Sequence, residues 1–441
     1  MPATRRDFLN TCSVLTGAAI LNPSGQTDAQ STAPTSADTA PPNAQNEIGT
    51  PYAGWKEGEM DLHFILTGVG ESMFYIYPDG TTMLLDAPDW NIESYRDRVP
   101  AIPDSSRLAS EWIMRYLMRV NPGGKSIDYM MLSHYHSDHA GCEDIHAGKT
   151  EGRGEDYCLS GLANIGEHFK FTKVFDRGYP TYDQPRVLQS DAFVNFVRFT
   201  KYMTKAGRFT MEELEVGRQD QLALCRAPEK YPTFHTRTIC KNGVVWTGKD
   251  METRNFYAEN EKNINGRINE NTLSIGYLIE YGPFRYFTGG DLSCSVFTAN
   301  DERINLEAQV GLVVGKLDVC KTNHHSYKDS MDPGFTNAVQ ARVYVSNVWD
   351  LHHLQDNTMT NMTSAAEDVL VCPTISHARA LEKYRDRPWM KNLAKEAQDG
   401  GGHIVVKVFD EGRQYKVYYL TAKDESMTVR QVYGPFKSRN A

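Results

Sequence analysis

Short apolar runs separated by turn residues open the part of the chain that we expect to fold. Three runs have strand composition, and the turn signals between them predict a β-meander; they are residues 62–66, 72–77 and 82–85. Residues 105–120 then carry apolar side chains at helical spacing, which predicts an amphipathic helix. Residues 127–132 predict a short buried strand that ends at Ser133.

The rest of the chain predicts a second β-rich half. The pattern is weaker over 143–270, where we expect helices at 191–204 and 211–215 and a strand pair at 234–239 and 244–246. Further on, strands are expected at 272–280, 284–288, 341–348, 403–409 and 415–420, and a largely helical stretch is expected at 378–397. Apolar runs at 310–314 and 317–320 lead into Lys321. Two β-rich halves with helices outside indicate an α/β fold with layered sheets.

Composition narrows the class of protein. The chain has 441 residues, a formal net charge of -9 and a 40% hydrophobic share, which excludes collagen-like, coiled-coil and fully disordered proteins. The acidic balance argues against binding nucleic acid through bulk charge, so no stable nucleic-acid complex is expected. No apolar run is long enough for a transmembrane anchor. Oligomeric state is left open, and no CxxC pair among the eight cysteines indicates a zinc ribbon.

The N-terminus resembles a bacterial twin-arginine export signal. Arg5 and Arg6 precede Phe8-Leu9 and a weakly apolar stretch. We therefore expect a signal over 1–30 and a periplasmic or secreted protein. A segment rich in Ser, Thr, Ala, Pro and Gln follows, and it predicts a disordered linker over 31–58 before a domain at 59–441.

A dense cluster of polar side chains follows the strand that ends at Ser133. His134, His136, Asp138 and His139 lie within six residues, in H-x-H-x-D-H order. Buried polar groups need partners, and imidazole and carboxylate ligands suit zinc, iron or manganese. His134 and His136 can face one cation, and Asp138 and His139 can face a second one beside it.

This motif resembles that of the metallo-β-lactamase superfamily. The resemblance covers about residues 60–420, with a weak middle, and it implies a four-layer αββα sandwich. Two later segments also match: Gly289-Gly290-Asp291, whose carboxylate would bridge two metals, and Lys321–His325, which would complete the second metal site. Asn271–Gly282 resembles the strand that precedes the bridging aspartate in the hydrolase domain of competence DNA-uptake proteins and in secreted choline-phosphate esterases.

The resemblance implies a metal ligand from the pair His324 and His325, and it leaves the third histidine ligand of the first metal unassigned. His324 is the preferred ligand of the pair, so His325 would face substrate or pack. Many members of the superfamily supply a third histidine to the first metal; the candidates here are His146, His168 and His235, and His235 is preferred. Asp86 is expected to be structural and Tyr135 to be a packing residue. His352 and His353 follow the strand ending at Val348; they are expected to be surface or core polar residues, with a place at the edge of the same pocket as the alternative.

The function implied is metal-dependent hydrolysis. One or two divalent cations, most simply two zinc ions but with manganese or iron as alternatives, would lower the pKa of a bound water toward about 7, and Asp138 would also orient the resulting hydroxide. The subgroup implies a phosphodiester or phosphate ester as substrate; an amide, lactone or carboxylic ester is the alternative. Diiron redox relatives typically carry a glutamate where His136 stands, which favours hydrolysis. A non-catalytic metal-binding relative is the third alternative.

Overall fold

Two large β-sheets form the framework of the computed structural model, which describes residues 46–89, 97–141, 157–183, 190–258, 268–294, 296–297 and 303–441. All of these residues belong to one unit, Ala40–Ala441. The predicted signal (1–30) lies outside the described residues. The end of the predicted linker (31–58) lies inside them: the Gly49 N–H donates to the Val429 carbonyl oxygen at 2.8 Å. The folded unit therefore includes residues from 46 onward.

The first sheet has nine strands in the order β19-β18-β17-β1-β2-β3-β4-β5-β6. Their bounds are β1 (Met60–Phe64), β2 (Met73–Ile76), β3 (Thr82–Leu85), β4 (Ser126–Met131), β5 (Lys170–Phe175), β6 (Thr210–Met211), β17 (His403–Phe409), β18 (Gln414–Leu420) and β19 (Val429–Lys437). Neighbours from β3 to β6 run parallel, and the other pairs are antiparallel. Asp86 and the loop that begins at Ser133 therefore leave the sheet at the same edge.

The second sheet has eight strands in the order β16-β15-β14-β11-β10-β7-β8-β9. Their bounds are β7 (Phe234–Lys241), β8 (Val244–Trp246), β9 (Thr253–Asn255), β10 (Gly276–Tyr281), β11 (Phe284–Thr288), β14 (Val319–Lys321), β15 (Val343–Ser346) and β16 (Leu370–Pro373); β12 (Val296–Phe297) and β13 (Arg303–Ile304) form a separate pair. The neighbours from β11 to β16 are parallel. Asp291, after β11, and His325, after β14, thus follow carboxyl ends of parallel strands, where ligands bind in α/β sheets.

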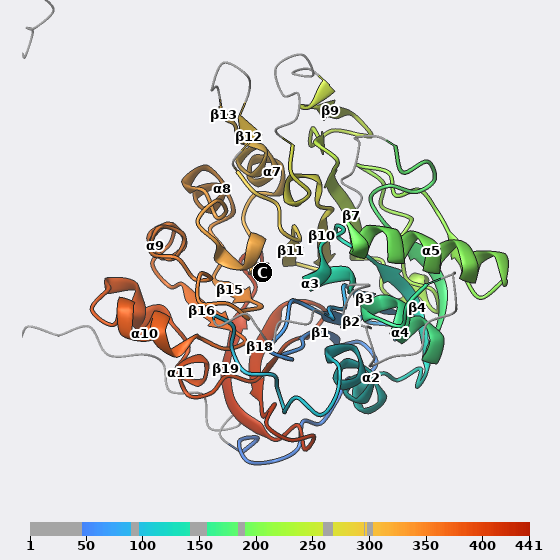
Figure 1. Cartoon of the computed structure of the whole chain (residues 1–441). Helices are drawn as coiled ribbons and strands as arrows, with labels where there is room; N and C mark the ends of the chain where they lie inside the picture. The colour runs from blue at the N-terminus through green and yellow to red at the C-terminus, as the bar shows by residue number, and fades with distance from the viewer. Residues whose placement is uncertain are drawn as a thin grey trace, which may run out of the picture. The chain divides into compact units, whose positions relative to one another are not determined.

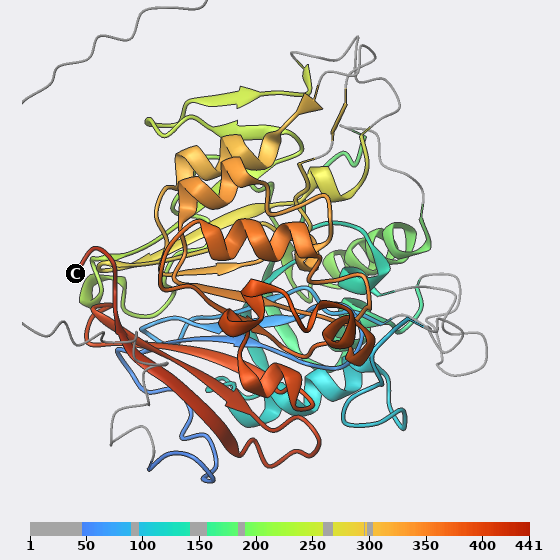
Figure 2. The same ribbon diagram turned by 90° about the vertical axis from the view of Figure 1, so that its left-hand side faces the viewer.

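Helices cover the outer faces of both sheets (Figures 1 and 2). The α-helices are α2 (Ala109–Val120), α3 (Ser137–Ala140), α4 (Gly161–His168), α5 (Asp191–Lys205), α7 (Leu306–Val314), α8 (Pro333–Val339), α9 (Asp356–Ser364), α10 (Ala378–Tyr384) and α11 (Lys395–Gln398). Short 3₁₀ turns are η2 (Pro228–Lys230), η4 (Asn271–Leu273), η5 (Asn323–Ser326) and η6 (Pro388–Asn392). Figure 1 shows α2, α4 and α5 on one side of the strands and α7, α8 and α9 on the other.

Strand alternation divides the apolar side chains into three cores. The core between the sheets contains Leu62 from β1 and Tyr277 from β10. A second core joins the first sheet to α2, α4 and α5, for example through Phe196, and a third joins the second sheet to α7, α8 and α9. Two tyrosine pairs cross the central core, Tyr75–Tyr286 at 2.7 Å and Tyr77–Tyr277 at 2.8 Å between hydroxyl oxygens. The expectation of an α/β fold with two sheets is confirmed. The assignment of the last strands to a second half is wrong, because β17, β18 and β19 join the first sheet beside β1.

Local structure follows the predicted pattern in some segments and departs from it in others. The helix predicted at 191–204 is α5, where Ser190 Oγ accepts a hydrogen bond from the Phe193 N–H. The helix predicted at 211–215 is wrong. The Gln221 side chain binds the Glu215 N–H at 2.8 Å and the Glu213 carbonyl at 2.6 Å, so these backbone groups are satisfied without a helix. The strand predicted from 272 begins at Gly276, after the 3₁₀ turn η4.

None of the described helices is both long and apolar enough to cross a membrane.

Candidate metal centre

The H-x-H-x-D-H loop is fixed to the first sheet by Asp86. The Asp86 carboxylate accepts hydrogen bonds from the Ser133 N–H at 2.7 Å and the Ser133 hydroxyl at 2.7 Å, and it faces His139 Nδ1 at 2.9 Å. Asp86 is fully buried and has a positive φ of 59°. The structural role expected for Asp86 is confirmed, and its carboxylate also orients His139.

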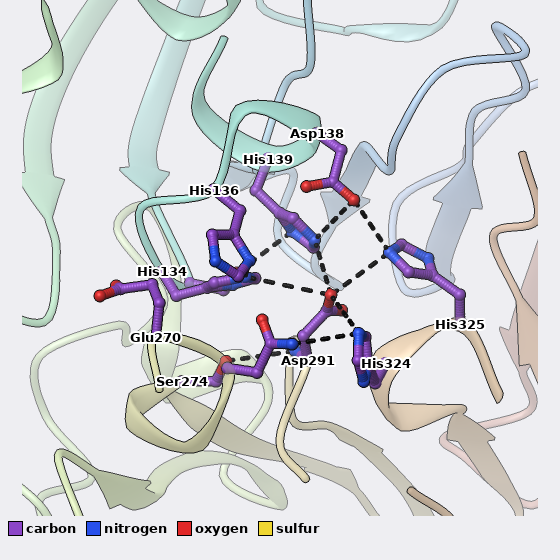
Figure 3. Close-up of polar contacts among 12 residues, drawn as sticks. His134, His136, Asp138, His139, Glu270, Ser274, Asp291, His324 and His325 are labelled. Atoms are coloured by element: carbon purple, nitrogen blue, oxygen red, sulfur yellow. Dashed lines mark hydrogen bonds and ion pairs between the residues drawn. The ribbon is translucent and has the colours of Figure 1, made fainter. Parts of the chain in front are cut away.

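Imidazoles from both sheets converge on Asp291 (Figure 3). The Asp291 Oδ2 atom lies 3.3 Å from His139 Nε2 and 3.4 Å from His325 Nε2. Asp138 Oδ2 lies 3.3 Å from His325 Nε2 and 3.8 Å from His139 Nε2. These four atoms enclose a common point, and three of the four separations match the about 3.3 Å between ligand atoms of a tetrahedral zinc site with bonds of about 2.0–2.1 Å.

The innermost polar atoms make no hydrogen bond within the described protein, although both Nε2 atoms lie within ion-pair distance of Asp291. His139 Nε2, His325 Nε2 and Asp291 Oδ1 are buried and accept or donate no hydrogen bond among the described residues. Buried polar atoms without partners are costly, and a cation would satisfy them. The buried group formed by Glu71, His139, Asp291 and His325, whose ligand atoms lie within 4.8 Å of one another, could therefore bind a divalent metal.

His134 and His136 form an adjoining pair of nitrogen atoms. His134 Nε2 lies 3.1 Å from His136 Nδ1 and 3.9 Å from Asp291 Oδ2. His134 is fully buried, while the Asp138 side chain is 13% exposed. Asp138 therefore lies toward the solvent side of the group, and the imidazoles of His134 and His139 lie toward its interior.

Sequence reasoning missed Glu71, which lies behind two of the histidines. Its carboxylate is 3.6 Å from His139 Nδ1 and 3.4 Å from His325 Nδ1, the ring atoms opposite the two Nε2 atoms. Buried Lys321 donates to both Glu71 oxygens, at 2.7 and 2.6 Å, and to the Gly290 carbonyl at 2.9 Å. Glu71 thus places a buried negative charge behind both imidazoles, whose Nδ1 atoms lie closer to Asp86 and to the Asn347 carbonyl oxygen. No motif marks it, because it comes from the turn before β2.

A second buried ion pair, also missed, holds the backbone of the motif. Arg177 Nε and Nη2 donate to the two carboxylate oxygens of Glu270 at 2.7 and 2.6 Å, and Glu270 Oε1 accepts from the Tyr135 N–H at 2.9 Å. The Arg177 guanidinium also lies 4.7 Å from the centre of the Tyr135 ring. Tyr135 is buried, so its expected packing role is confirmed, and its backbone is held between His134 and His136.

The other histidines named as candidates lie in different places. His235 is exposed on β7 opposite Glu280, four residues along β10 from the end that faces the site. His168 is exposed at the end of α4, and His146 lies outside the described residues. His353 stacks on His325 with ring centroids 4.5 Å apart, and His352 faces Asp97 at 3.6 Å. The structure therefore does not bring His168 or His235 to the group.

The paired histidines meet Asp291 through an unusual turn. His324, His325 and Ser326 have φ values of 44°, 49° and 61°, which non-glycine residues rarely adopt. Successive side chains of an extended segment point to opposite sides. Here both rings face one carboxylate, because His324 Nε2 also lies 3.9 Å from Asp291 Oδ2. The sequence analysis preferred His324 over His325 as a metal ligand, but His325 is the one that lies in the innermost group.

Charge within the group explains the pKa shifts. Burial alone would lower the pKa of His325, but Asp291 and Asp138 outweigh burial and raise that pKa to about 10. Burial also opposes the charged form of His139, yet Asp291, Asp138 and Glu71 raise its pKa well above the usual value. Burial and the neighbouring His139 and His136 lower the pKa of His134 well below its usual value.

Metal binding at pH 7 is therefore expected to release protons. The neighbouring carboxylates favour the protonated forms of His139 and His325 in the cation-free protein, and a protonated ring must lose a proton before it binds a cation. Apparent affinity should rise about tenfold per pH unit for each proton released between pH 6 and pH 8. Calorimetry in two buffers with different ionisation heats measures the protons directly, and a pH-independent affinity would contradict this assignment.

Removing the Asp86 charge is expected to weaken metal binding. In Asp86→Asn the amide would donate toward His139 Nδ1, which would favour the tautomer with its proton on Nε2 and block that atom as a ligand. We expect affinity to fall by about 10- to 100-fold in a chelator-competition assay. Asp128→Asn is the matched control, because Asp128 lies on β4 and binds Thr82 and Arg226. Equal affinity in Asp86→Asn and wild type would exclude this role.

Comparisons with known proteins show similarity to solved structures. No family model matches the chain, and the search of curated proteins found no similar sequence. Among solved structures, the chain is similar to the crystal structure of hydrolase AbOPH in the beta-lactamase superfamily. The identity is 12%, the match covers 57% of this chain and 77% of that chain, and the TM-score is 0.26. A likeness of this extent assigns no role to individual residues.

Proposed function

We propose that this protein is a metal-dependent hydrolase with the αββα sandwich of the metallo-β-lactamase superfamily. The observation that carries the proposal is the convergence of His139 Nε2, His325 Nε2 and the Asp291 carboxylate, which are buried and have unpartnered atoms. Residues from two sheets supply them, so the arrangement is a product of the fold. His134, His136 and Asp138 extend the same group.

The chain's own residues would position the reactants. Divalent cations held there, zinc or alternatively manganese or iron, would supply a water of lowered pKa and polarise the substrate oxygen. Asp138 is 13% exposed at the solvent side of the group, so its carboxylate would orient that water toward an incoming substrate. Asp291, only 2% exposed, would supply a negative charge that both sets of cation ligands share.

A phosphodiester or phosphate ester is the substrate that we propose. The motif order of the chain resembles that of hydrolases acting on such bonds, and His136 stands where diiron redox relatives carry a glutamate. Cationic centres also stabilise the charge that develops on a phosphoryl oxygen during displacement. Amide, lactone and carboxylic ester substrates are the alternatives that a substrate panel would identify.

Export by the twin-arginine route is part of the proposal. Its support is the Arg5-Arg6 pair followed by Phe8-Leu9 and a weakly apolar stretch. Replacing both arginines by lysine should keep the protein inside the cytoplasm of a bacterial host. Unchanged delivery to the periplasm would reject this route.

The test of the function combines metal content with turnover. The full chain, loaded with zinc or manganese, should hydrolyse bis-p-nitrophenyl phosphate, and His134→Ala and Asp138→Ala should abolish the activity and reduce bound metal. His352→Ala is a matched control, because its side chain is 52% exposed and faces Asp97. Absence of turnover on phosphodiester, ester, lactone and lactam substrates by metal-loaded protein would indicate a non-catalytic metal-binding protein.

A further inference from the structure

A buried carboxyl group on α7, which no motif marks, lies behind the loop that carries the paired histidines. Glu307 lies in the first turn of α7 and is fully buried. The start of this helix is fixed, because the Asn305 side chain accepts a hydrogen bond from the Ala308 N–H at 3.0 Å. Glutamate is rarely buried completely unless it has partners, so the partners of Glu307 indicate what it does.

The hydrogen bonds of Glu307 come from the two ends of one loop, residues 323–332, which we call the histidine loop. Its Oε1 atom accepts from Asn323 Nδ2 and from the Met331 N–H, both at 2.7 Å. Its Oε2 atom accepts from the Asp332 N–H at 2.8 Å. The carboxyl group therefore joins the beginning of the histidine loop to its end and attaches both to α7.

The backbone of the histidine loop needs such support. His325 lies in this loop, and its Nε2 atom lies 3.4 Å from Asp291 Oδ2. Positive φ values of 44° to 61° occur at His324, His325, Ser326 and Met331. Non-glycine residues rarely adopt this conformation, and it persists where the surrounding structure enforces it. Glu307 holds the residues on both sides of the left-handed turn.

These hydrogen bonds do not depend on the charge of Glu307. Burial raises the pKa of Glu307 to about 8, while the three hydrogen bonds oppose that rise. A carboxyl group keeps acceptor lone pairs on its oxygens with or without the proton. An amide of the same shape has a nitrogen that accepts no hydrogen bond, so at least one of the three donors would lose its acceptor in Glu307→Gln.

We propose that Glu307 is a positioning residue of the metal centre, which fixes the place of His325 beside Asp291 by joining the two ends of the histidine loop. It touches neither cation nor substrate, and it acts through the loop alone. Ligands must be held within about 0.5 Å of their working positions, so a loop that shifts would weaken cation binding. This inference rests on the proposed function, and it adds a residue outside the metal group that sets the geometry of the group.

Zinc affinity of the full chain, measured by chelator competition, tests the assignment. Glu307→Gln should bind zinc about 10-fold more weakly than wild type, at the lower end of the range for residues that orient ligands. Asp318→Asn is the comparison, because Asp318 is also fully buried and accepts from the Arg285 N–H at 2.9 Å and the Arg439 N–H at 2.7 Å. Asp318 precedes β14, whereas the histidine loop follows it. Both variants should lose stability in urea, and only Glu307→Gln should lose zinc affinity.

A second variant and a spectrum distinguish positioning from a purely structural role. Asn323→Ala removes one of the three donors and should weaken zinc binding in the same direction but less than Glu307→Gln. The Asn323 Oδ1 atom makes no hydrogen bond among the described residues, so this variant loses no other side-chain hydrogen bond. In cobalt-loaded protein, the absorption spectrum should change in Glu307→Gln and match wild type in Asp318→Asn.

The outcomes separate this inference from the function on which it rests. Wild-type zinc affinity and cobalt spectrum in both Glu307→Gln and Asn323→Ala would overturn the positioning role and leave the hydrolase proposal standing. An equal loss of zinc affinity in Asp318→Asn would also overturn it, because the loss would then follow from general destabilisation. A wild-type protein that binds no zinc, manganese or iron would overturn both proposals. If Glu307→Gln fails to fold, the affinity and spectrum of Asn323→Ala decide.

Discussion

Asp291→Asn is expected to remove metal and to abolish phosphodiester turnover. The substitution keeps the shape of the side chain but removes the charge of the oxygen that faces His139, His325, His134 and His324 at 3.3 to 3.9 Å. Loss of an outer partner costs about 10- to 100-fold in metal affinity or activity, and loss of a direct, shared ligand should exceed that range. Metal analysis of purified protein and kcat/KM on bis-p-nitrophenyl phosphate are the measurements.

Asp386→Asn is the control for this variant, since the Asp386 side chain is 91% exposed and its carboxylate faces Arg385. It should leave metal content and turnover at the wild-type level. Circular dichroism of Asp291→Asn distinguishes a lost ligand from a lost fold. A folded Asp291→Asn protein with full metal content and activity would reject the converging group as the centre of the enzyme.

Lys321→Met is expected to lower the free energy of unfolding by about 3–5 kcal/mol. Lys321 and Glu71 are both fully buried, and the lysine binds both carboxylate oxygens. Removing the lysine leaves a buried negative charge without its partner, which is the costly way to break such a pair. Urea denaturation followed by tryptophan fluorescence measures the change. Metal affinity should fall as well, because the uncompensated carboxylate favours protonated His139 and His325.

Two comparisons make this prediction specific. The double variant Glu71→Gln/Lys321→Met removes both members of this buried ion pair, and it should be more stable than Lys321→Met alone. Lys230→Met removes an exposed partner of Glu57 and should change stability by no more than about 1 kcal/mol. A loss below about 1 kcal/mol in Lys321→Met would show that the pair does not support the fold.

Much of the local structure near the site is predictable because it depends on nearby residues. The buried strand before Ser133 is β4, and the hairpin predicted at 403–409 and 415–420 is formed by β17 and β18. Patterns of alternation and helical spacing capture these elements, since each buries one face. The helix predicted at 211–215 does not form, because the side chain of Gln221 supplies hydrogen-bond partners for the backbone of this segment.

The sequence by itself determined the candidate ligands that lie close together in the chain, His134, His136, Asp138 and His139, because metal ligands on one loop produce a dense polar motif. The family resemblance also named Asp291, His324, His325 and His235, and only the tertiary structure decided which of these distant residues join the loop. Parallel strands bring Asp291 and His325 to that loop. His235 lies on β7 opposite Glu280, away from the end of β10 that faces the site. The Glu71–Lys321 pair spans 250 residues, so no local pattern records it. Strand pairing and burial of charge depend on the whole fold, and they determine which polar residues of the chain come together in the site.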